Sequence, residues 1–143
     1  MVTVIIAAHG HLAPALIDSA AMIMGEQDGV VPVTFDPSEG PDDLLAKYEA
    51  AAEGETLLLV DFFGGSPYNA AARFAAARED TDIVTGVSLA MLIEVLGKRR
   101  GSADVAKLVA TAKKAGAAGV RVFSEVYTKP TATVAEDDEG DEL

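Results

Sequence analysis

Stretches of consecutive apolar residues alternate along this chain with longer segments in which apolar residues recur every three or four positions. Val2 to Ala8 and Thr56 to Val60 are apolar almost throughout, which is the pattern of strands buried on both faces of a parallel sheet. Two shorter strands are predicted at Val30 to Phe35 and Asp82 to Val87. Because Pro32 has no backbone N–H to donate to a neighbour, the second strand is expected at an edge of the sheet.

Segments with helical periodicity lie between and after these strands. They are Leu12 to Met24, Pro41 to about Ala52, Pro67 to about Ala77, a helix capped by Ser88 and ended by Gly97, and a helix capped by Ser102 and ended by Gly116. A short final strand is predicted at Val120 to Phe123. Strands that alternate with helices build a parallel sheet with helices on both faces. We therefore expect an α/β fold of the flavodoxin-like type, with strand order 2-1-3-4.

The end of the chain differs in composition from the rest. Six of the last eight residues, Glu136 to Leu143, are acidic and none is basic. A segment with so few apolar residues cannot bury enough surface to fold, so we predict a domain at 1–127 and a disordered acidic tail at 128–143. The net charge of the whole chain is −12, from 11 basic and 23 acidic residues, and setting the six tail acids aside leaves −6.

This composition excludes several functional classes. No basic stripe of the kind that binds a phosphate backbone is present, so nucleic acid is not expected as a partner. No apolar run approaches the roughly 20 residues needed to cross a bilayer, so direct membrane insertion is not expected. The chain has no cysteine, which excludes disulfides and thiolate metal sites. A cytoplasmic location is therefore the expectation.

Two of the predicted strands end at residues that can do chemistry. His9 follows the first strand and Asp61 follows the third. In the predicted order these strands are neighbours about 4.8 Å apart. Their connections leave toward opposite faces, so their carboxyl ends form the switch point where α/β sheets bind ligands. We expect the Asp61 carboxylate to hold one imidazole nitrogen of His9 and to leave the other free as a nucleophile.

A glycine turn completes the candidate site. Gly64 and Gly65 lead through Ser66, a predicted N-cap, into the helix that begins at Pro67. The unpaired N–H groups of a helix N-terminus favour an anion, and Ser66 adds a hydroxyl. A nucleophilic imidazole, an orienting carboxylate and an anion seat together indicate phosphoryl transfer through a phosphohistidine.

Less specific explanations exist for these residue types. A histidine after a strand is commonly a structural or surface residue, an aspartate there commonly caps a loop, and Gly-Gly-Ser-Pro forms a turn without a ligand. His11 is expected at the rim of the site, Arg73 is expected to be solvated or to face a partner, and Phe62 and Phe63 fit either the core or a pocket wall. A flavodoxin or a receiver domain is disfavoured, because the first strand is followed by neither a Ser/Thr-rich loop nor an acid pair.

Several segments resemble one known family. Ile5 to Gly10 and Val60 to Ala71 look like the EIIA component of the mannose-type, phosphoenolpyruvate-dependent sugar phosphotransferase system (PTS), and Gly86 to Glu94 is similar to a further stretch of that family. The resemblance spans about residues 2–123. The chain departs from the family pattern at Ala8, where threonine is frequent, and at Phe63, where tryptophan is common.

The resemblance implies a phosphotransferase that needs no metal or organic cofactor. In the family, the histidine that matches His9 accepts a phosphoryl group from the phosphohistidine of the carrier HPr. It passes that group to a histidine on EIIB, which is expected here to be a separate chain. The residues that match Asp61 and Ser66 hydrogen-bond the imidazole and lie beside the phosphate, and the membrane components EIIC and EIID are partners only indirectly.

The resemblance also implies an assembly. Such proteins are usually homodimers in which the final strand, here Val120 to Phe123, crosses to the partner's sheet. An alternative function stays open beside transport. In that alternative the chain is a regulatory, phosphorylation-sensing module of the same fold that is not coupled to sugar uptake.

Overall fold

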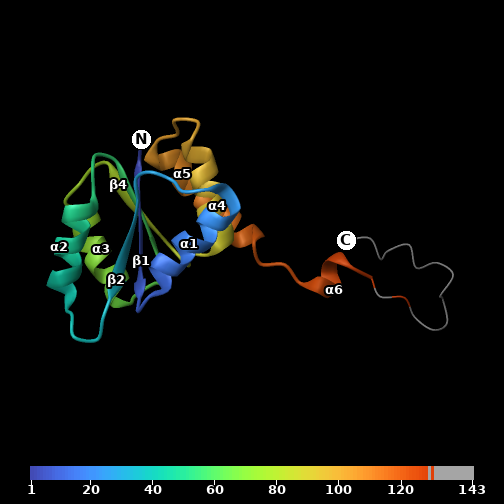
Figure 1. Cartoon of the computed structure of the whole chain (residues 1–143), viewed down its shortest axis with the longest axis horizontal. Helices are drawn as coiled ribbons and strands as arrows, with labels where there is room; N and C mark the ends of the chain where they lie inside the picture. The colour runs from blue at the N-terminus through green and yellow to red at the C-terminus, as the bar shows by residue number, and fades with distance from the viewer. Residues whose placement is uncertain (129, 131–143) are drawn as a thin grey trace.

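The computed structural model describes residues 1–128 and 130. In chain order its elements are β1 (Thr3–His9), α1 (Leu12–Met24), β2 (Val30–Phe35), α2 (Pro41–Ala51), β3 (Thr56–Val60), α3 (Ser66–Ala76), β4 (Thr81–Thr85), α4 (Leu89–Arg99), α5 (Val105–Ala118) and α6 (Phe123–Val126). The strands form one parallel sheet in the order β2-β1-β3-β4, with helices on both faces (Figure 1). The predicted strand order and the edge position of β2 are confirmed.

The two central strands are buried on both faces of the sheet. Along β1, the side chains of Val4, Ile6 and Ala8 pack in one core with α1, α4 and α5, whereas Ile5 and Ala7 pack in the other with α2 and α3. All five side chains are fully buried. Both sides of the strand must therefore be apolar, which explains why its sequence is continuously apolar rather than alternating.

The predicted final strand is wrong for the single chain. Residues 120–122 form no regular element, and the short helix α6 begins at Phe123. The backbone at Val122 is extended, with φ −109° and ψ 126°, but a strand also needs a neighbour for its hydrogen bonds. Figure 1 shows this segment running away from the sheet beyond α5. Its exchange between subunits stays a prediction. The predicted tail at 128–143 lies outside the described residues except for Thr128 and Pro130.

Two glycines that were predicted to end helices lie inside them. Gly97 is within α4 and Gly116 is within α5. A side chain at Gly116 would place its Cβ 2.7 Å from the terminal methyl of Met91, so the glycine leaves room for that side chain between the two helices. The cap of α5 also differs from the prediction, because the Asp104 carboxylate, not Ser102, accepts the Lys107 N–H at 2.9 Å. At Gly116, packing between α4 and α5 therefore outweighs the low helix propensity of glycine.

A buried arginine ties the end of α4 to the start of the sheet. The Arg99 side chain is only 2% exposed. Its guanidinium donates to the carbonyl oxygens of Val2 at 2.9 Å, Gly29 at 3.1 Å, and Asp28. These carbonyls precede β1 and β2, so one side chain satisfies backbone groups at the start of two strands.

Within the described residues, no helix is long and apolar enough to span a bilayer.

Replacing Arg99 with methionine tests this tie. We expect the free energy of unfolding to fall by about 2–4 kcal/mol, because the buried carbonyl of Val2 and the partly buried carbonyls of Asp28 and Gly29 lose a charged donor. Urea unfolding followed by circular dichroism gives the value. Arg100→Met is the matched control, since Arg100 is exposed and donates one 3.3 Å hydrogen bond to the Met24 carbonyl. Equal unfolding midpoints for the two variants would contradict the role of Arg99.

Candidate functional site

The carboxyl ends of β1 and β3 bring His9 and Asp61 into contact. The imidazole Nδ1 lies 2.7 Å from Asp61 Oδ2, and the same oxygen accepts the backbone N–H of His9 at 2.9 Å. The second oxygen, Oδ1, accepts the backbone N–H of Phe62 at 3.0 Å. The His9 side chain is 45% exposed and that of Asp61 is 12% exposed. Two backbone N–H groups thus hold the carboxylate in place, while the imidazole is exposed to solvent.

The charge of Asp61 determines which ring nitrogen is free. Burial alone would raise the pKa of Asp61, but the hydrogen bonds from the backbone N–H of His9, its imidazole and the Phe62 N–H outweigh burial. The pKa therefore lies below its ordinary value of 3.8. Because an ionised carboxylate can only accept, Nδ1 is assigned the proton. Nε2 then carries the lone pair, and within the described residues it has no hydrogen-bond partner.

The glycine turn after Asp61 places the start of α3 against this ring. Gly64 has φ +90°, a left-handed conformation that favours glycine. Gly65 follows with an extended backbone and is the N-cap of α3, so Ser66 is its first helical residue. The prediction of Ser66 as N-cap is therefore wrong by one position, because the Gly65 carbonyl already accepts the Asn69 N–H at 2.9 Å. Within residues 1–128 and 130 the Ser66 hydroxyl makes no hydrogen bond.

Gly65 makes the closest approach between the turn and the imidazole. A Cβ atom at this position would lie 3.0 Å from Cε1 of His9, and also 3.0 Å from Cε1 and Cζ of Phe62. Such a separation is tighter than nine in ten real Cβ contacts. The structure therefore brings His9, Asp61 and Gly65 together directly, with Gly64 and Ser66 on either side of Gly65 in the same turn.

Below the turn, a buried tyrosine holds the first turn of α3. The Tyr48 hydroxyl on α2 donates to the Pro67 carbonyl at 2.8 Å. Burial, and then the negative charge of Asp61, raise the pKa of Tyr48 above its ordinary value. The hydroxyl therefore keeps its proton and its hydrogen bond across the physiological pH range. Helical periodicity in the sequence gives no indication of this contact, because it joins residues on two different helices.

Two phenylalanine rings contact the imidazole. The Phe62 ring stacks on it, with centroids 5.4 Å apart and an interplanar angle of 26°. The Phe35 ring meets it edge-on at 5.6 Å and 85°. Phe35 was not predicted, although it ends β2 directly opposite His9 in the register. Phe62 and Phe63 are 54% and 72% exposed, so neither belongs to the core.

The two other residues considered from the sequence lie outside the contact between His9 and Asp61. His11 is exposed at the N-cap position of α1, close in sequence to His9. The exposed Arg73 guanidinium lies 3.4 Å from Asp42 Oδ1 on α2, so it pairs with a neighbouring helix. Neither makes a hydrogen bond or ion pair with the His9–Asp61 pair.

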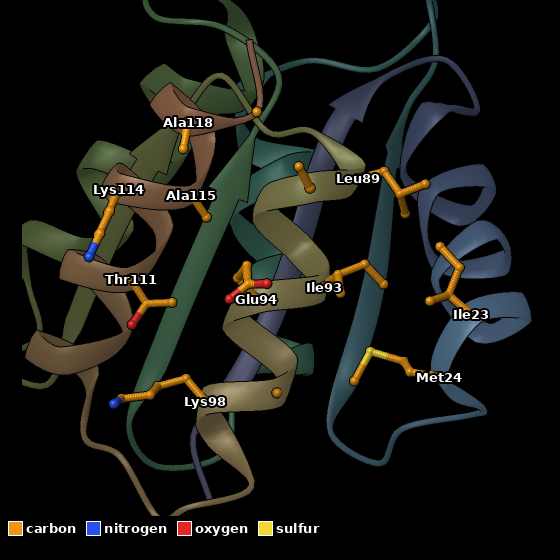
Figure 2. A pocket seen from close by; sticks show the side chains of 13 residues that line it. Ile23, Met24, Leu89, Ile93, Glu94, Lys98, Thr111, Lys114, Ala115 and Ala118 are labelled. Atoms are coloured by element: carbon orange, nitrogen blue, oxygen red, sulfur yellow. The ribbon is translucent and has the colours of Figure 1, made fainter. Parts of the chain in front are cut away.

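An open apolar groove lies elsewhere on the surface. It crosses the outer side of α1, α4 and α5 (Figure 2), where Ile23, Met24, Leu89 and Ile93 line it and Lys98 and Lys114 stand at its rim. None of the residues predicted for the site lines this groove. The reactive groups and this concave surface are therefore separate features of the molecule.

Fold and site together define a doubly wound α/β protein with a histidine–aspartate pair at its switch point. Residues 3–113 match the family model EIIA-man, described as the PTS system fructose IIA component. The chain belongs to this family, the mannose-type EIIA components of the sugar phosphotransferase system, which are phosphotransferases by family.

Individual relatives agree with this assignment. The fructose-specific EIIA component of Bacillus subtilis is 39% identical over 148 residues and is matched over the whole of both chains. The mannose-specific EIIAB component of Escherichia coli K12 is 38% identical over 127 residues, which cover 85% of this chain but 39% of that protein. The crystal structure of a phosphotransferase system EIIA component from Streptococcus agalactiae superposes with a TM-score of 0.83 at 27% identity, covering 87% of this chain and 99% of that one.

Asp61 should contribute stability in a pH-dependent way. Its pKa is lower in the folded chain than the ordinary 3.8, so its contribution is present above that value and is lost as the pH falls through the folded pKa. We expect the difference in unfolding free energy between wild type and Asp61→Asn to shrink as the pH falls below about 5, the upper end of the range in which such a carboxylate loses its contribution. Urea unfolding at each pH measures it, and a difference that stays constant would refute the inference.

Proposed function

We propose that this chain is a phosphocarrier of a sugar phosphotransferase system. His9 accepts a phosphoryl group from the phosphohistidine of HPr and passes it to EIIB for sugar uptake. The observation that carries this proposal is the 2.7 Å contact between Nδ1 of His9 and Asp61 Oδ2, which leaves Nε2 free beside the N-terminus of α3. Membership of the EIIA-man family supports it.

In this mechanism the reaction is an in-line exchange between two imidazoles. The Nε2 lone pair of His9 attacks the phosphorus atom, a new N–P bond forms, and the N–P bond to the donor histidine breaks. The donor imidazole leaves with the electron pair of the broken bond. The proton on Nδ1 of His9 stays in place, so the phosphorylated ring becomes positively charged, and the Asp61 carboxylate stabilises that charge.

The turn after Asp61 provides the seat for the phosphoryl oxygens. Gly64 and Gly65 lead the chain into α3. The first N–H groups of this helix have no acceptor within it, point out of its N-terminal end and favour negative charge there. Because Gly65, not Ser66, is the N-cap, the Ser66 hydroxyl is available to donate to a phosphoryl oxygen. Transfer to EIIB runs through the same steps in the opposite direction, with EIIC and EIID reached only through EIIB. We propose the cytoplasm as the location of this transfer.

Labelling from phosphoenolpyruvate tests the nucleophile. With the general PTS enzyme and HPr present, we expect one acid-labile phosphoryl group per chain on His9. The label is lost in His9→Ala and kept in His11→Ala, the matched control. Label that persists in His9→Ala would sink the assignment. Addition of a mannose-family EIIB should remove the label from His9 by phosphoryl transfer. Label that EIIB cannot remove would favour the alternative function as a regulatory module.

We also propose that the chain is a homodimer with exchanged C-terminal arms, the arm being residues 120–126. In the described residues β4 is an edge strand that pairs only with β3. A groove runs along β4 and α5 and is lined by apolar residues that include Ile83, Val84 and Val109. Val120, Val122 and Val126 of the arm are 79%, 46% and 42% exposed, so the arm carries apolar side chains that the groove of a second copy can bury.

Light scattering after size-exclusion chromatography tests the dimer. We expect the wild type at roughly twice the chain mass of 14.8 kDa, because in a symmetric dimer each arm can cover the β4 edge of the other subunit. The double variant Val120→Asp with Val122→Asp should run as a monomer. Met22→Asp is the control, since Met22 is 89% exposed on α1, outside the arm. A dimer that survives the double variant would exclude arm exchange.

A further inference from the structure

We propose that Phe62 is a positioning residue for His9. Its ring holds the plane of the imidazole so that Nε2, and not another edge of the ring, meets the phosphorus atom. This inference rests on the proposed phosphocarrier function and adds to it a residue that the histidine–aspartate pair does not include.

The contact with Asp61 does not by itself orient the imidazole. A single hydrogen bond holds Nδ1 at 2.7 Å, but the ring can still swing about that contact. The χ2 torsion of histidine has broad wells. A full flip about χ2 exchanges Nδ1 with Cδ2 and Nε2 with Cε1. It breaks the contact with Asp61, frees Nδ1 and puts a carbon atom where Nε2 would meet the donor. A second contact is therefore needed to define the plane of the ring.

Phe62 supplies that contact on one face of the imidazole. The rings are stacked at 5.4 Å and 26°, within the range of favourable aromatic pairs. The Phe35 edge limits movement on another side. Gly65 lies against both stacked rings, since a Cβ atom at this position would be 3.0 Å from atoms of His9 and of Phe62. The imidazole is thus held between two aromatic rings and the start of α3.

Burial in the core does not explain Phe62. Phe62 is 54% exposed, so it is not a core residue, and its one ring contact within the described residues is the stack on His9. Its backbone N–H donates to Asp61 Oδ1, so one carboxylate positions both the imidazole and the residue stacked upon it. The next residue is a useful contrast, because the Phe63 ring packs on Tyr68 at 4.7 Å and makes no ring contact with His9.

The stacked ring also matters during the reaction. The imidazole gains positive charge as Nε2 bonds to phosphorus, and an aromatic face attracts a cation that lies over it. Leucine at position 62 would keep apolar bulk but lose this face, whereas tyrosine would keep it. Bulk and stacking can therefore be separated by substitution.

The test uses the full chain and a small phosphoryl donor, phosphoramidate, so that docking of HPr plays no part. We expect Phe62→Ala and Phe62→Leu to slow phosphorylation of His9 about 5- to 20-fold, within the cost of a misaligned reactive group. Part of the label should move from Nε2 to Nδ1, which ³¹P NMR distinguishes. Phe62→Tyr should stay within about twofold of wild type, and so should Phe63→Ala, the matched control.

A second measurement reports the stack without any reaction. In wild type the Phe62 ring current should shift the His9 Cε1–H resonance, and Phe62→Ala should abolish that shift while the amide spectrum of the sheet is unchanged. Wild-type rate and Nε2 selectivity in Phe62→Ala would overturn the positioning role and leave the phosphocarrier function intact. A wild-type chain that takes label from neither phosphoramidate nor phosphorylated HPr would overturn both.

Discussion

Three hydrogen bonds converge on the carboxylate of Asp61, and the geometry of the site depends on them. They come from the backbone and the imidazole of His9 on β1 and from the backbone of Phe62 just beyond β3. The pair therefore joins the ends of two adjacent central strands as well as two side chains. Because the donors outweigh the cost of burial, the carboxylate keeps its charge. That charge defines the free nitrogen of the ring, and the same carboxylate fixes the start of the turn that leads to Gly65.

The rigid part of the molecule lies directly behind this exposed site. β1 and β3 are buried between two helical layers, and Tyr48 fastens α2 to the first turn of α3. Reacting groups at the end of such a scaffold need little reorganisation when a partner arrives. The proposed phosphoryl exchange with other proteins also requires an accessible imidazole, and His9, 45% exposed, meets that requirement. The open groove over α1, α4 and α5 is also accessible, but none of the residues predicted for the site lines it.

The C-terminal segment shows how an isolated chain can leave a local preference unsatisfied. Val120 and Val122 have the β-branched side chains of a strand, and the backbone at Val122 is extended. No strand forms there, because a ladder requires a second strand and this segment has left its own sheet. The dimer proposed above rests on two separate observations, the edge of β4 that pairs only with β3 in the described residues and the exposed apolar side chains of the arm.

Much of this protein could be predicted from the order of its residues. Continuous apolar runs identified β1 and β3, and the alternation of strands with helices predicted the strand order that brings His9 beside Asp61. The edge position of β2, predicted from Pro32, agrees with that order. Local patterns could not place Phe35 or the ring of Phe62 against the imidazole, because those contacts join segments distant in sequence or depend on a turn angle. They also misjudged Ser66 and Gly116, where backbone geometry and helix packing outweigh residue preference. The sequence alone determined which residues could react. The tertiary structure decided how the imidazole of His9 is held, because ring orientation depends on neighbours that only folding brings together.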